Sequence, residues 1–332
     1  MTPLVELHRG PAVESSHAGH VVVVDADGRA VFEAGEPATP VFPRSAIKLL
    51  QAMPLVASDA AEEWGYGDRE LALACSSHSG EPAHVETARA MLAAAGLDET
   101  CLECGGHWSF RQLVLIEQAR AFAERPGAIC NNCSGKHSGF LALAAHEGWG
   151  TTGYIEPDHP VQMNLARHMA ELTGEPHDER NRARDGCSIP TYAVPLHSLA
   201  RAMARACTRS DAAARLLRAC TSEPFFTAGT ARFCTDYMLA ANGAAYCKTG
   251  AEGVFCGFLP EQGLAIALKV ADRAARAAEV TFAVVANAFL DRDGLDRFEA
   301  VPVRTWRGID AGVLRPVPAF HERLLAAAAA SR

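Results

Sequence analysis

The sequence predicts an α+β protein in which segments from both ends of the chain form one antiparallel sheet around a largely helical middle. Three observations support this prediction. Apolar runs near both ends have the β-branched composition and flanking turn signals of strands. The segments between them repeat apolar residues at helical spacing. The resulting order, strands, then helices, then strands and a helix, is typical of this fold class.

The first strands are predicted to form a hairpin. Residues 21–24 are a run of four valines, Asp27-Gly28 is a strong turn signal, and residues 30–32 resume the apolar pattern. A helix is expected over residues 45–53, because apolar residues recur there at helical spacing after two prolines. Ser45 stands where an N-cap or first-turn residue belongs.

The middle and last thirds of the chain follow the same rules. Further helices are expected at residues 83–95, 112–124, 135–147, 160–172, 193–208, 211–219 and 274–289, with residues 68–74 either a helix or a short strand. Strands are expected at 253–258 and 263–270, loops at 101–108 and 180–190, and a frayed helix end at 325–332. No repeat or linker divides the chain. We therefore expect a single catalytic unit over residues 1–332, with an α/β part at about 1–50 and 225–332 and a helical part at about 51–224.

Composition excludes several classes of function. The chain has 31 Lys and Arg against 39 Asp and Glu, a net charge of −8, and no cluster of basic residues, which disfavours a nucleic-acid partner. The N-terminus lacks the basic start and apolar core of a signal peptide, and no apolar run is long enough to span a membrane. Eleven cysteines, an odd number, argue against a disulfide framework. We expect a cytoplasmic protein with a small-molecule substrate.

The first candidate for chemistry is Ser45-x-x-Lys48. Residues i and i+3 share one face of a helix, so the lysine amine can reach the serine hydroxyl. Serine is a poor nucleophile until a base removes its proton, and a lysine can be that base when its pKa is lowered. The structural alternative is an N-capping serine beside a surface lysine, and this short motif alone does not decide between them.

A second motif, Lys248-Thr249-Gly250, lies in a predicted strand. Serine acyl-transfer enzymes with a Ser-x-x-Lys nucleophile carry Lys-Thr-Gly on the edge strand beside the pocket. Such enzymes place a third polar element between the two motifs, and Ser77-His78-Ser79 is the candidate here. The structural alternative for that segment is a hydrogen-bonded turn that begins a helix.

Two further groups could bind a metal or a substrate. Cys133 and His137 are four residues apart, which can put two ligands on one helical face, and a cysteine from a distant loop, such as Cys187, could complete a site. Arg232 and Asp236 could form an internal ion pair, or could bind the carboxylate and the ammonium group of an amino-acid substrate, although a solvated helix face explains this pair equally well. Phosphate-binding glycine motifs are absent, so no nucleotide cofactor is expected.

Taken together, these segments resemble the Rhizobium-type, or class 3, L-asparaginase family from about Leu4 to about Phe320. The resemblance rests on eight short blocks that occur in one order. They are Arg9-Gly10 with Val13-Glu14-Ser15-x-His17; Pro43-Arg44-Ser45-x-x-Lys48; Cys75-x-Ser77-His78-Ser79-Gly80-Glu81; Cys104-Gly105-x-His107; Asn132-Cys133-Ser134-Gly135-Lys136-His137; His159-Pro160-Val161-Gln162; Asp185-Gly186-Cys187-Ser188-x-Pro190; and Lys248-Thr249-Gly250-Ala251-Glu252-Gly253.

The resemblance implies a fold similar to serine β-lactamases and glutaminases, a homodimer, and hydrolysis of L-asparagine to L-aspartate and ammonia. It implies two Ser-Lys pairs, Ser45 with Lys48 and Ser77 with Lys248; either serine could attack, and we favour Ser45. It also implies a zinc site. Its ligands would be Cys133, Lys136 and Cys187. The expected substrate-binding residues are Arg44, His78, Asp185, Arg232 and Cys234, of which Asp185 and Cys234 would lie close to the metal.

The sequence departs from the family pattern at one turn and leaves two rival functions open. Ala271-Asp272-Arg273 stands where Asp-Asp-Gly is expected, and Cys247 and Cys256 are extra thiols near Lys248. The first rival is a glutaminase or another serine acyl hydrolase of the same fold, such as a β-lactam-binding enzyme. The second is a non-catalytic protein that binds zinc or an amino acid. Ammonia release from asparagine discriminates among them.

Overall fold

The computed structural model describes residues 1–290 and 292–331 and divides into two compact units. The sheet unit comprises Met1–Ile47, Val194–Arg209 and Tyr237–Arg332. The helical unit comprises Lys48–Ala193 and Ser210–Asp236. The segment Val194–Arg209 therefore belongs with the sheet, although it lies in the middle of the sequence.

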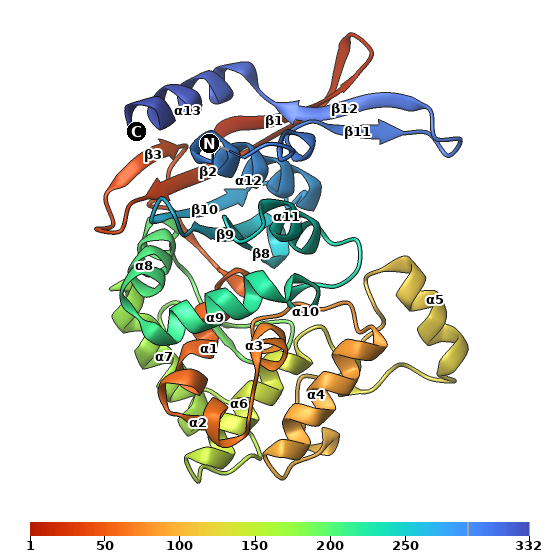
Figure 1. Cartoon of the computed structure of the whole chain (residues 1–332), viewed down its shortest axis with the longest axis vertical. Helices are drawn as coiled ribbons and strands as arrows, with labels where there is room; N and C mark the ends of the chain where they lie inside the picture. Colours follow the sequence, from red (N-terminus) through yellow and green to blue (C-terminus); the bar gives the residue numbers. More distant parts are fainter. Residues whose placement is uncertain (291, 332) are drawn as a thin grey trace. The chain divides into compact units, whose positions relative to one another are not determined.

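In the part of the chain that the structure describes, the sheet unit contains an eight-stranded sheet in the order β11-β12-β1-β2-β10-β9-β8, with β3 paired to β2 (Figure 1). All its neighbouring strands are antiparallel. The strands are β1 Thr2–Arg9, β2 Ala12–Val24, β3 Ala30–Ala34, β8 Tyr246–Thr249, β9 Val254–Leu259, β10 Leu264–Val270, β11 Val301–Arg304 and β12 Asp310–Pro316. Because β1 pairs with β12 and β2 with β10, the two ends of the chain share one sheet, which confirms the predicted α+β class.

Helices cover both faces of this sheet. Helix α8 (Leu196–Arg209) packs on β2, β9 and β10, while α12 (Ala275–Phe289) packs on β9, β10 and β12. Helix α13 (Pro318–Ala330) packs on β1 and β3 beside α12. The middle strands are therefore continuous apolar runs, since a strand buried on both faces has no polar side.

The helical unit consists of helices joined by long loops. Its helices are α1 Lys48–Ala57, α2 Ala60–Glu63, α3 Asp68–Ala74, α4 Pro82–Ala94, α5 Gln112–Ala121, α6 Ser134–His146, α7 Pro160–Thr173, α9 Asp211–Ser222 and α10 Pro224–Thr227, while α11 (Phe233–Ala241) begins here and ends in the sheet unit. Helix α6 is the centre of the unit, because it is buried from Ser134 to Ala144 and packs against α1, α3, α4 and α7. A helix that is buried on all sides normally carries few charged residues. Helix α6 buries one charged residue, Lys136, which belongs to the site described below.

Most predicted elements are confirmed, and one predicted loop is instead part of a short hairpin. The hairpin forms with its turn at Gly28, whose φ of 82° favours glycine, and residues 68–74 are a helix. The loop expected at 180–190 is wrong, since β5 (Arg182–Arg184) pairs with β6 (Pro190–Tyr192). The three residues of β5 are all exposed, so no apolar alternation marks them as a strand.

Two more expectations changed at the C-terminal end. The tail is not frayed over its described residues, because α13 continues to Ala330 and buries Leu324 and Ala328, while Arg332 lies outside the described residues. The turn after β10 does form without the expected glycine: Arg273 adopts a φ of 68°, and Asp272 accepts a hydrogen bond from His17 Nδ1 at 2.5 Å. Among the described residues, no helix is long and apolar enough to cross a bilayer.

Candidate active site

The loop between α3 and α4 carries the serine of the third predicted motif. Ser77 is 5% exposed and its backbone N–H donates to Thr227 O at 3.1 Å. The N–H of His78 donates to Asn132 O, also at 3.1 Å. These bonds to two other segments of the helical unit satisfy buried donors and hold the loop in one conformation.

Lys48, the first residue of α1, has a buried side chain that contacts this loop. Its side chain is 1% exposed, and its Nζ donates to Ser77 Oγ at 3.1 Å and to Cys133 Sγ at 3.1 Å. The third partner is the carbonyl of Ser76. An ammonium group has three donors, so these three acceptors satisfy it without water. The sequence predicted that Lys48 pairs with Ser45. Within the helical unit, Lys48 instead contacts the hydroxyl of Ser77.

His78 and Arg232 support the same loop. His78 Nδ1 accepts from the Gly80 N–H at 3.0 Å, which leaves the proton on Nε2 to donate to Ser134 Oγ at 2.9 Å. Burial, reinforced by the neighbouring His84 and Lys48, holds the pKa of His78 well below its usual range, so the ring is neutral.

The Arg232 guanidinium lies against this loop from the chain just before α11. It donates to Ser77 O at 3.3 Å and to Ser79 Oγ at 3.5 Å. Arg232 was proposed as a substrate-binding residue or as part of a solvated helix face. The geometry joins half-buried Arg232 to the backbone of the serine that Lys48 contacts, whereas Asp236 is exposed to solvent.

A second cluster of buried polar side chains lies beside Lys48. Cys133 and Lys136 come from the start of α6, and Cys187 comes from the loop between β5 and β6. Lys136 Nζ donates to Cys187 Sγ at 3.0 Å, and the thiols of Cys133 and Cys187 are hydrogen-bonded to each other. All three side chains are at most 5% exposed. The predicted trio is therefore together in space.

The charges in this cluster depend on one another. The hydrogen bond from Cys133 lowers the pKa of Cys187 well below that of a free thiol, and the same bond raises the pKa of Cys133 to about 12. Cys187 is thus the thiolate and Cys133 the thiol. Burial alone would lower the pKa of Lys136, but the charges of Cys187, Cys133 and Asp185 outweigh it and raise the pKa. Lys136 is the cation that balances the cluster.

These residues fit a zinc ion in ligand type. Zinc is bound by thiolate sulfur and by nitrogen, and two thiols with one amine offer both. No group of three or more His, Cys, Asp or Glu side chains within residues 1–290 and 292–331 could hold a metal, so any metal here needs the lysine. Lys136 can be a ligand only as a neutral amine, and Cys133 only as a thiolate, so each must first lose a proton.

His137 does not join this cluster, although its spacing from Cys133 suggested a ligand pair. Its Nδ1 hydrogen-bonds with the Tyr154 hydroxyl at 2.6 Å. Asn131, just before Cys133, holds the start of α6 with Oδ1 accepting from the Cys133 N–H at 2.8 Å. Gly135 is required because a Cβ there would lie 2.4 Å from Leu73 O, so α6 meets α3 at this point. We missed Asn131 in the sequence, where Asn-Asn before a helix is a turn signal.

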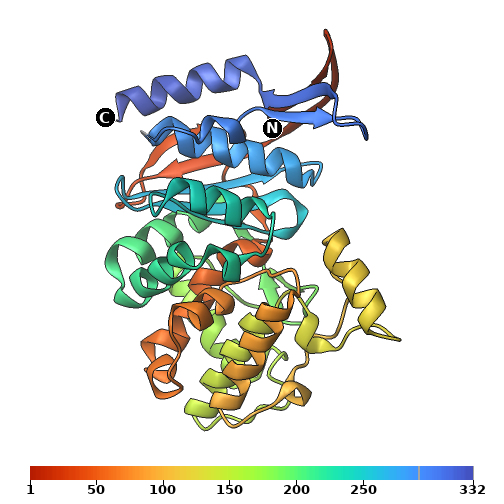
Figure 2. The same ribbon diagram turned by 45° about the vertical axis from the view of Figure 1, so that its right-hand side comes forward.

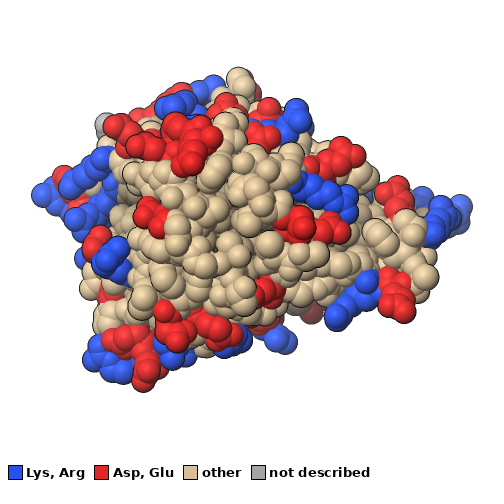
Figure 3. Space-filling view, turned by 90° about the horizontal axis from the view of Figure 1, so that it is seen from below, with Lys and Arg blue, Asp and Glu red and all other residues tan. Residues whose placement is uncertain are grey.

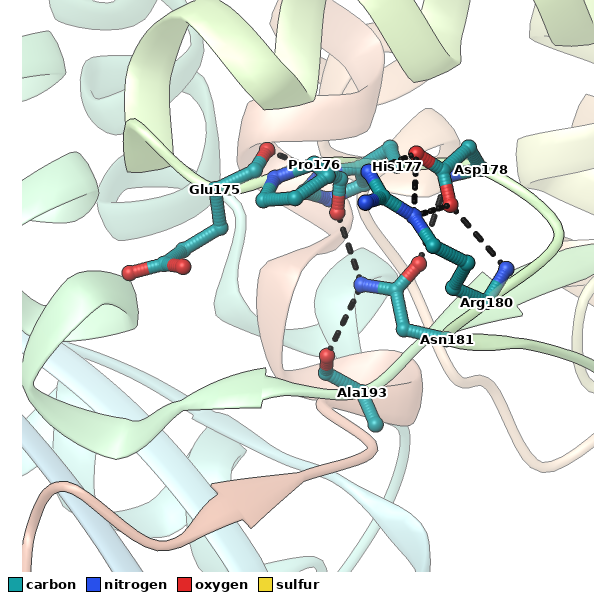
Figure 4. Close-up of polar contacts among 7 residues, drawn as sticks. All are labelled: Glu175, Pro176, His177, Asp178, Arg180, Asn181 and Ala193. Atoms are coloured by element: carbon teal, nitrogen blue, oxygen red, sulfur yellow. Dashed lines mark hydrogen bonds and ion pairs between the residues drawn. The ribbon is translucent and has the colours of Figure 1, made fainter.

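A short hairpin presents Cys187 and Asp185 to the cluster. Asn181 joins the two ends of the hairpin, with Nδ2 donating to Pro176 O at 2.7 Å and to Ala193 O at 3.0 Å (Figure 4). The neighbouring Arg180 pairs with Asp178 at 2.6 Å (Figure 4).

The tip of the hairpin is a tight turn that holds the carboxylate of Asp185 in place. The Asp185 N–H donates to Ile189 O at 2.8 Å, and Asp185 Oδ1 accepts from the Gly186 N–H at 2.6 Å. Cys234, the last predicted neighbour of the metal site, is buried at the start of α11.

The remaining predicted residues lie in the sheet unit. Ser45 and Arg44 stand in a 3₁₀ turn, Arg44–Ile47, and Arg44 has a φ of 51°, which is uncommon for a residue with a side chain. Lys248 is fully buried on the edge strand β8, where its Nζ donates to Thr249 O at 2.9 Å. A Cβ on Gly250 would lie 2.9 Å from Pro43 O, so glycine lets this strand approach the turn that carries Ser45.

The sequence has only four lysines, and three of them are Lys48, Lys136 and Lys248. Each of the three is at most 2% exposed. A lysine amine is buried at low cost only where polar partners surround it, so these three positions need partners such as the acceptors described above for each of them. The face seen in Figure 3 is broadly uncharged, and among its coloured residues the Lys and Arg side chains form no continuous band that would suit a nucleic acid.

One comparison with known proteins identifies the family of this chain. The family model described as L-asparaginase II matches residues 5–316. No curated protein sequence matches the chain significantly. Among solved structures, a β-lactamase from Mycobacterium bovis is similar, with 16% sequence identity, a TM-score of 0.38, and coverage of 81% of this chain and 94% of that one. Because the family match spans nearly the whole chain, this chain belongs to the L-asparaginase II family, and it is an asparaginase-type amidohydrolase with a small amino-acid substrate.

Proposed function

We propose that this chain is an L-asparaginase that hydrolyses the side-chain amide of L-asparagine to L-aspartate and ammonia through serine and lysine. One observation carries the proposal: Lys48 is buried and donates hydrogen bonds to Ser77 Oγ and Cys133 Sγ. A lysine so placed can exchange a proton with a hydroxyl without competition from water.

In this mechanism Lys48 must first lose one proton of its ammonium group. Its amine then accepts the hydroxyl proton of Ser45 as Ser45 Oγ attacks the amide carbon. Backbone N–H groups stabilise the oxyanion. The carbon–nitrogen bond then breaks, and Ser77 and Lys248 pass a proton to the leaving ammonia. Water attacks the resulting β-aspartyl ester and releases aspartate with the serine restored. The hydrogen bond between Lys48 and Ser77 supports the relay, because it joins the base to the second hydroxyl.

We further propose that Cys133, Lys136 and Cys187 hold a zinc ion, with Asp185 beside it. When bound, the ion would supply a fixed positive charge that orients the amino-acid end of the substrate. Arg44, His78, Arg232 and Cys234 complete the proposed substrate pocket, His78 and Arg232 by holding the Ser77 loop. None of the eleven cysteines is in a disulfide, which supports the cytoplasm as the compartment. We also propose a homodimer.

The test is ammonia release from L-asparagine and from L-glutamine, together with ring opening of a chromogenic β-lactam followed by its absorbance, each measured with and without added zinc. We expect turnover of asparagine above that of the other two. Ser45→Ala should remove nearly all turnover while the protein stays folded; retention of most activity would move the attack to Ser77. Higher kcat/KM on glutamine or the β-lactam would replace the asparaginase assignment, and tight asparagine binding without ammonia release would make the chain a binding protein.

A further inference from the structure

Two polar side chains of strand β2 have no role in the proposed mechanism. Ser15 and His17 are two residues apart on this strand, so their side chains point to the same face of the sheet. Figures 1 and 2 show β1 and β2 as a red hairpin whose tip projects from the sheet unit. Strand β1 pairs with β2 at both positions, which fixes the register and holds a hydroxyl beside an imidazole.

Asp272, from the turn after β10, completes a chain of hydrogen bonds with these two residues. Its carboxylate accepts a hydrogen bond from His17 Nδ1 at 2.5 Å. A carboxylate can only accept, so in the neutral imidazole the proton lies on Nδ1 and Nε2 is the acceptor. The Ser15 hydroxyl donates to that Nε2 at 3.3 Å. Serine, histidine and aspartate are thus joined in the order of a Ser-His-Asp triad.

Burial along this chain of groups suits a general base and its nucleophile. His17 is 5% exposed, whereas the Asp272 side chain is 48% exposed and Ser15 is half-buried. The Ala274 N–H donates to Asp272 Oδ1 at 3.0 Å, which fixes the carboxylate. Burial alone would raise the pKa of Asp272, but the hydrogen bonds from Ala274 and His17 outweigh it and lower the pKa. The imidazole is therefore held by an ionised partner, while a reagent can reach the hydroxyl.

An open sheet edge lies next to Ser15. Strand β10 pairs with residues 19–24 of β2, and β3 pairs with residues 21–24. Among the strands that the structure describes, β1 alone pairs with residues 12–17. The other edge of β2 beside Ser15 is therefore available for backbone hydrogen bonds to an extended acyl group.

We propose that Ser15, His17 and Asp272 form a second nucleophilic site, within the sheet unit, that hydrolyses carboxylic esters. Ser15 Oγ bonds to the carbonyl carbon while its proton passes to His17 Nε2. The bond from that carbon to the alcohol oxygen then breaks, and the alcohol leaves with the proton. Water attacks the acyl-serine, His17 transfers a proton from the water to Ser15 Oγ, and the carboxylic acid is released. The site goes beyond the proposed asparaginase and does not rest on it.

The first test treats the full chain with a fluorophosphonate probe and locates the label by peptide fragmentation. Ser15 Oγ displaces fluoride from phosphorus, which leaves a stable phosphonyl-serine. Ser16 is the internal control, because it is exposed on the opposite face of the same strand. We expect label on Ser15 and none on Ser16. Absence of label on Ser15, or equal label on both serines, overturns the proposal, whichever serine hydrolyses asparagine.

Variants of the two partners test whether the reactivity comes from the triad. His17→Gln should slow labelling of Ser15 at least about 100-fold, the size of a lost general base. Asp272→Asn should slow it at least about tenfold, because a carboxamide can donate to Nδ1 and favour the other tautomer. Arg276→Gln, at an exposed position of α12, is the control and should stay within about twofold of wild type. Should His17→Gln fail to fold, an unchanged rate in Asp272→Asn refutes the triad by itself.

The last test concerns the substrate class and compares Ser15→Ala with Ser16→Ala. Release of p-nitrophenolate from p-nitrophenyl acetate measures ester hydrolysis. We expect kcat/KM to be at least about tenfold lower in Ser15→Ala than in Ser16→Ala, because only Ser15 has the base beside it. Equal values in the two variants would overturn the assignment of esters as substrates of this site.

Discussion

The two units bury different kinds of side chain. The core of the sheet unit is mostly apolar, as in the buried run Val21–Val24, although Lys248 is also buried on its edge strand β8. The centre of the helical unit instead buries Lys48, Lys136 and His137, each at most 2% exposed, among serines and thiols. Burial of a charged side chain lowers the stability of the folded state, because the charge loses its water. Burial of a valine side chain raises that stability, because apolar surface is removed from water. The sheet unit thus confines its buried lysine to an edge strand, whereas the helical unit buries its two lysines at its centre.

Lys48→Met tests the helical side of this comparison and should have the largest effect. Methionine has similar length and no charge, and replacing a buried cation by an apolar side chain is often tolerated by the fold. We expect kcat to fall on the order of 10³-fold, the size of a lost general base. The melting temperature should drop by only a few degrees, from the hydrogen bonds lost at Ser76 and Ser77.

The control for this change is Lys269→Met. Lys269 is the one lysine outside the proposed site and lies on β10. Its kcat should stay within about twofold of wild type, since it touches no proposed catalytic group. Equal losses in both variants would mean that lysine removal acts through the fold and not through the site.

Leu268→Ala tests the sheet side. Leu268 is fully buried on β10, and truncation of such a side chain costs about 3 kcal/mol of unfolding free energy. Below the melting temperature, kcat should be unchanged, because no site residue packs on it in the proposal. Denaturant unfolding and kcat on the same samples check both parts. Leu325→Ala, 48% exposed on α13, is the matched control and should cost under about 0.5 kcal/mol.

Zinc binding should depend on pH through Lys136 and Cys133. Both have raised pKa values and both must lose a proton to bind the metal, so affinity rises with pH by up to about a hundredfold per unit. Lys136→Ala releases one proton fewer, and the slope should fall to about tenfold per unit. Chelator competition at several pH values measures it. Cys101→Ser, at a half-exposed thiol outside the cluster, should keep the wild-type slope, and an unchanged slope in Lys136→Ala would exclude the amine as a ligand.

Local sequence patterns predicted the helices and strands well, because the residues that start, stop or turn an element lie within it or next to it. The valine run, the Asp27-Gly28 turn and Pro160 at the start of α7 each fix the backbone within a few residues. Exposed strands were missed for the same reason. Strand β11 has no buried residue and contains Pro302, so it reads as a loop until β12 pairs with it.

The site residues could be proposed from motifs, but their contacts could not. Spacing joined Ser45 to Lys48 and Cys133 to His137, both within one helical turn. The structure instead brings Lys48 to Ser77 and Lys136 to Cys187, which are 29 and 51 residues apart. Such contacts depend on how α1, α3 and α6 pack against one another. The close approach of α6 to α3 at Gly135 permits this packing, but a single glycine leaves no periodic signal in the sequence.

The turn after β10 gives the smallest prediction, and it belongs to the sheet unit. Arg273 has a left-handed φ of 68°, which costs a residue with a Cβ about 1 kcal/mol, whereas glycine adopts it freely. Arg273→Gly relieves this strain but loses the exposed ion pair with Glu252 and adds disorder to the unfolded chain. We expect a net stabilisation below about 1 kcal/mol, measured by denaturant unfolding, with kcat unchanged. Arg273→Ala keeps the strain and loses the same ion pair, so it should be less stable than Arg273→Gly; the reverse order would show that the ion pair and not the backbone sets the stability of this turn.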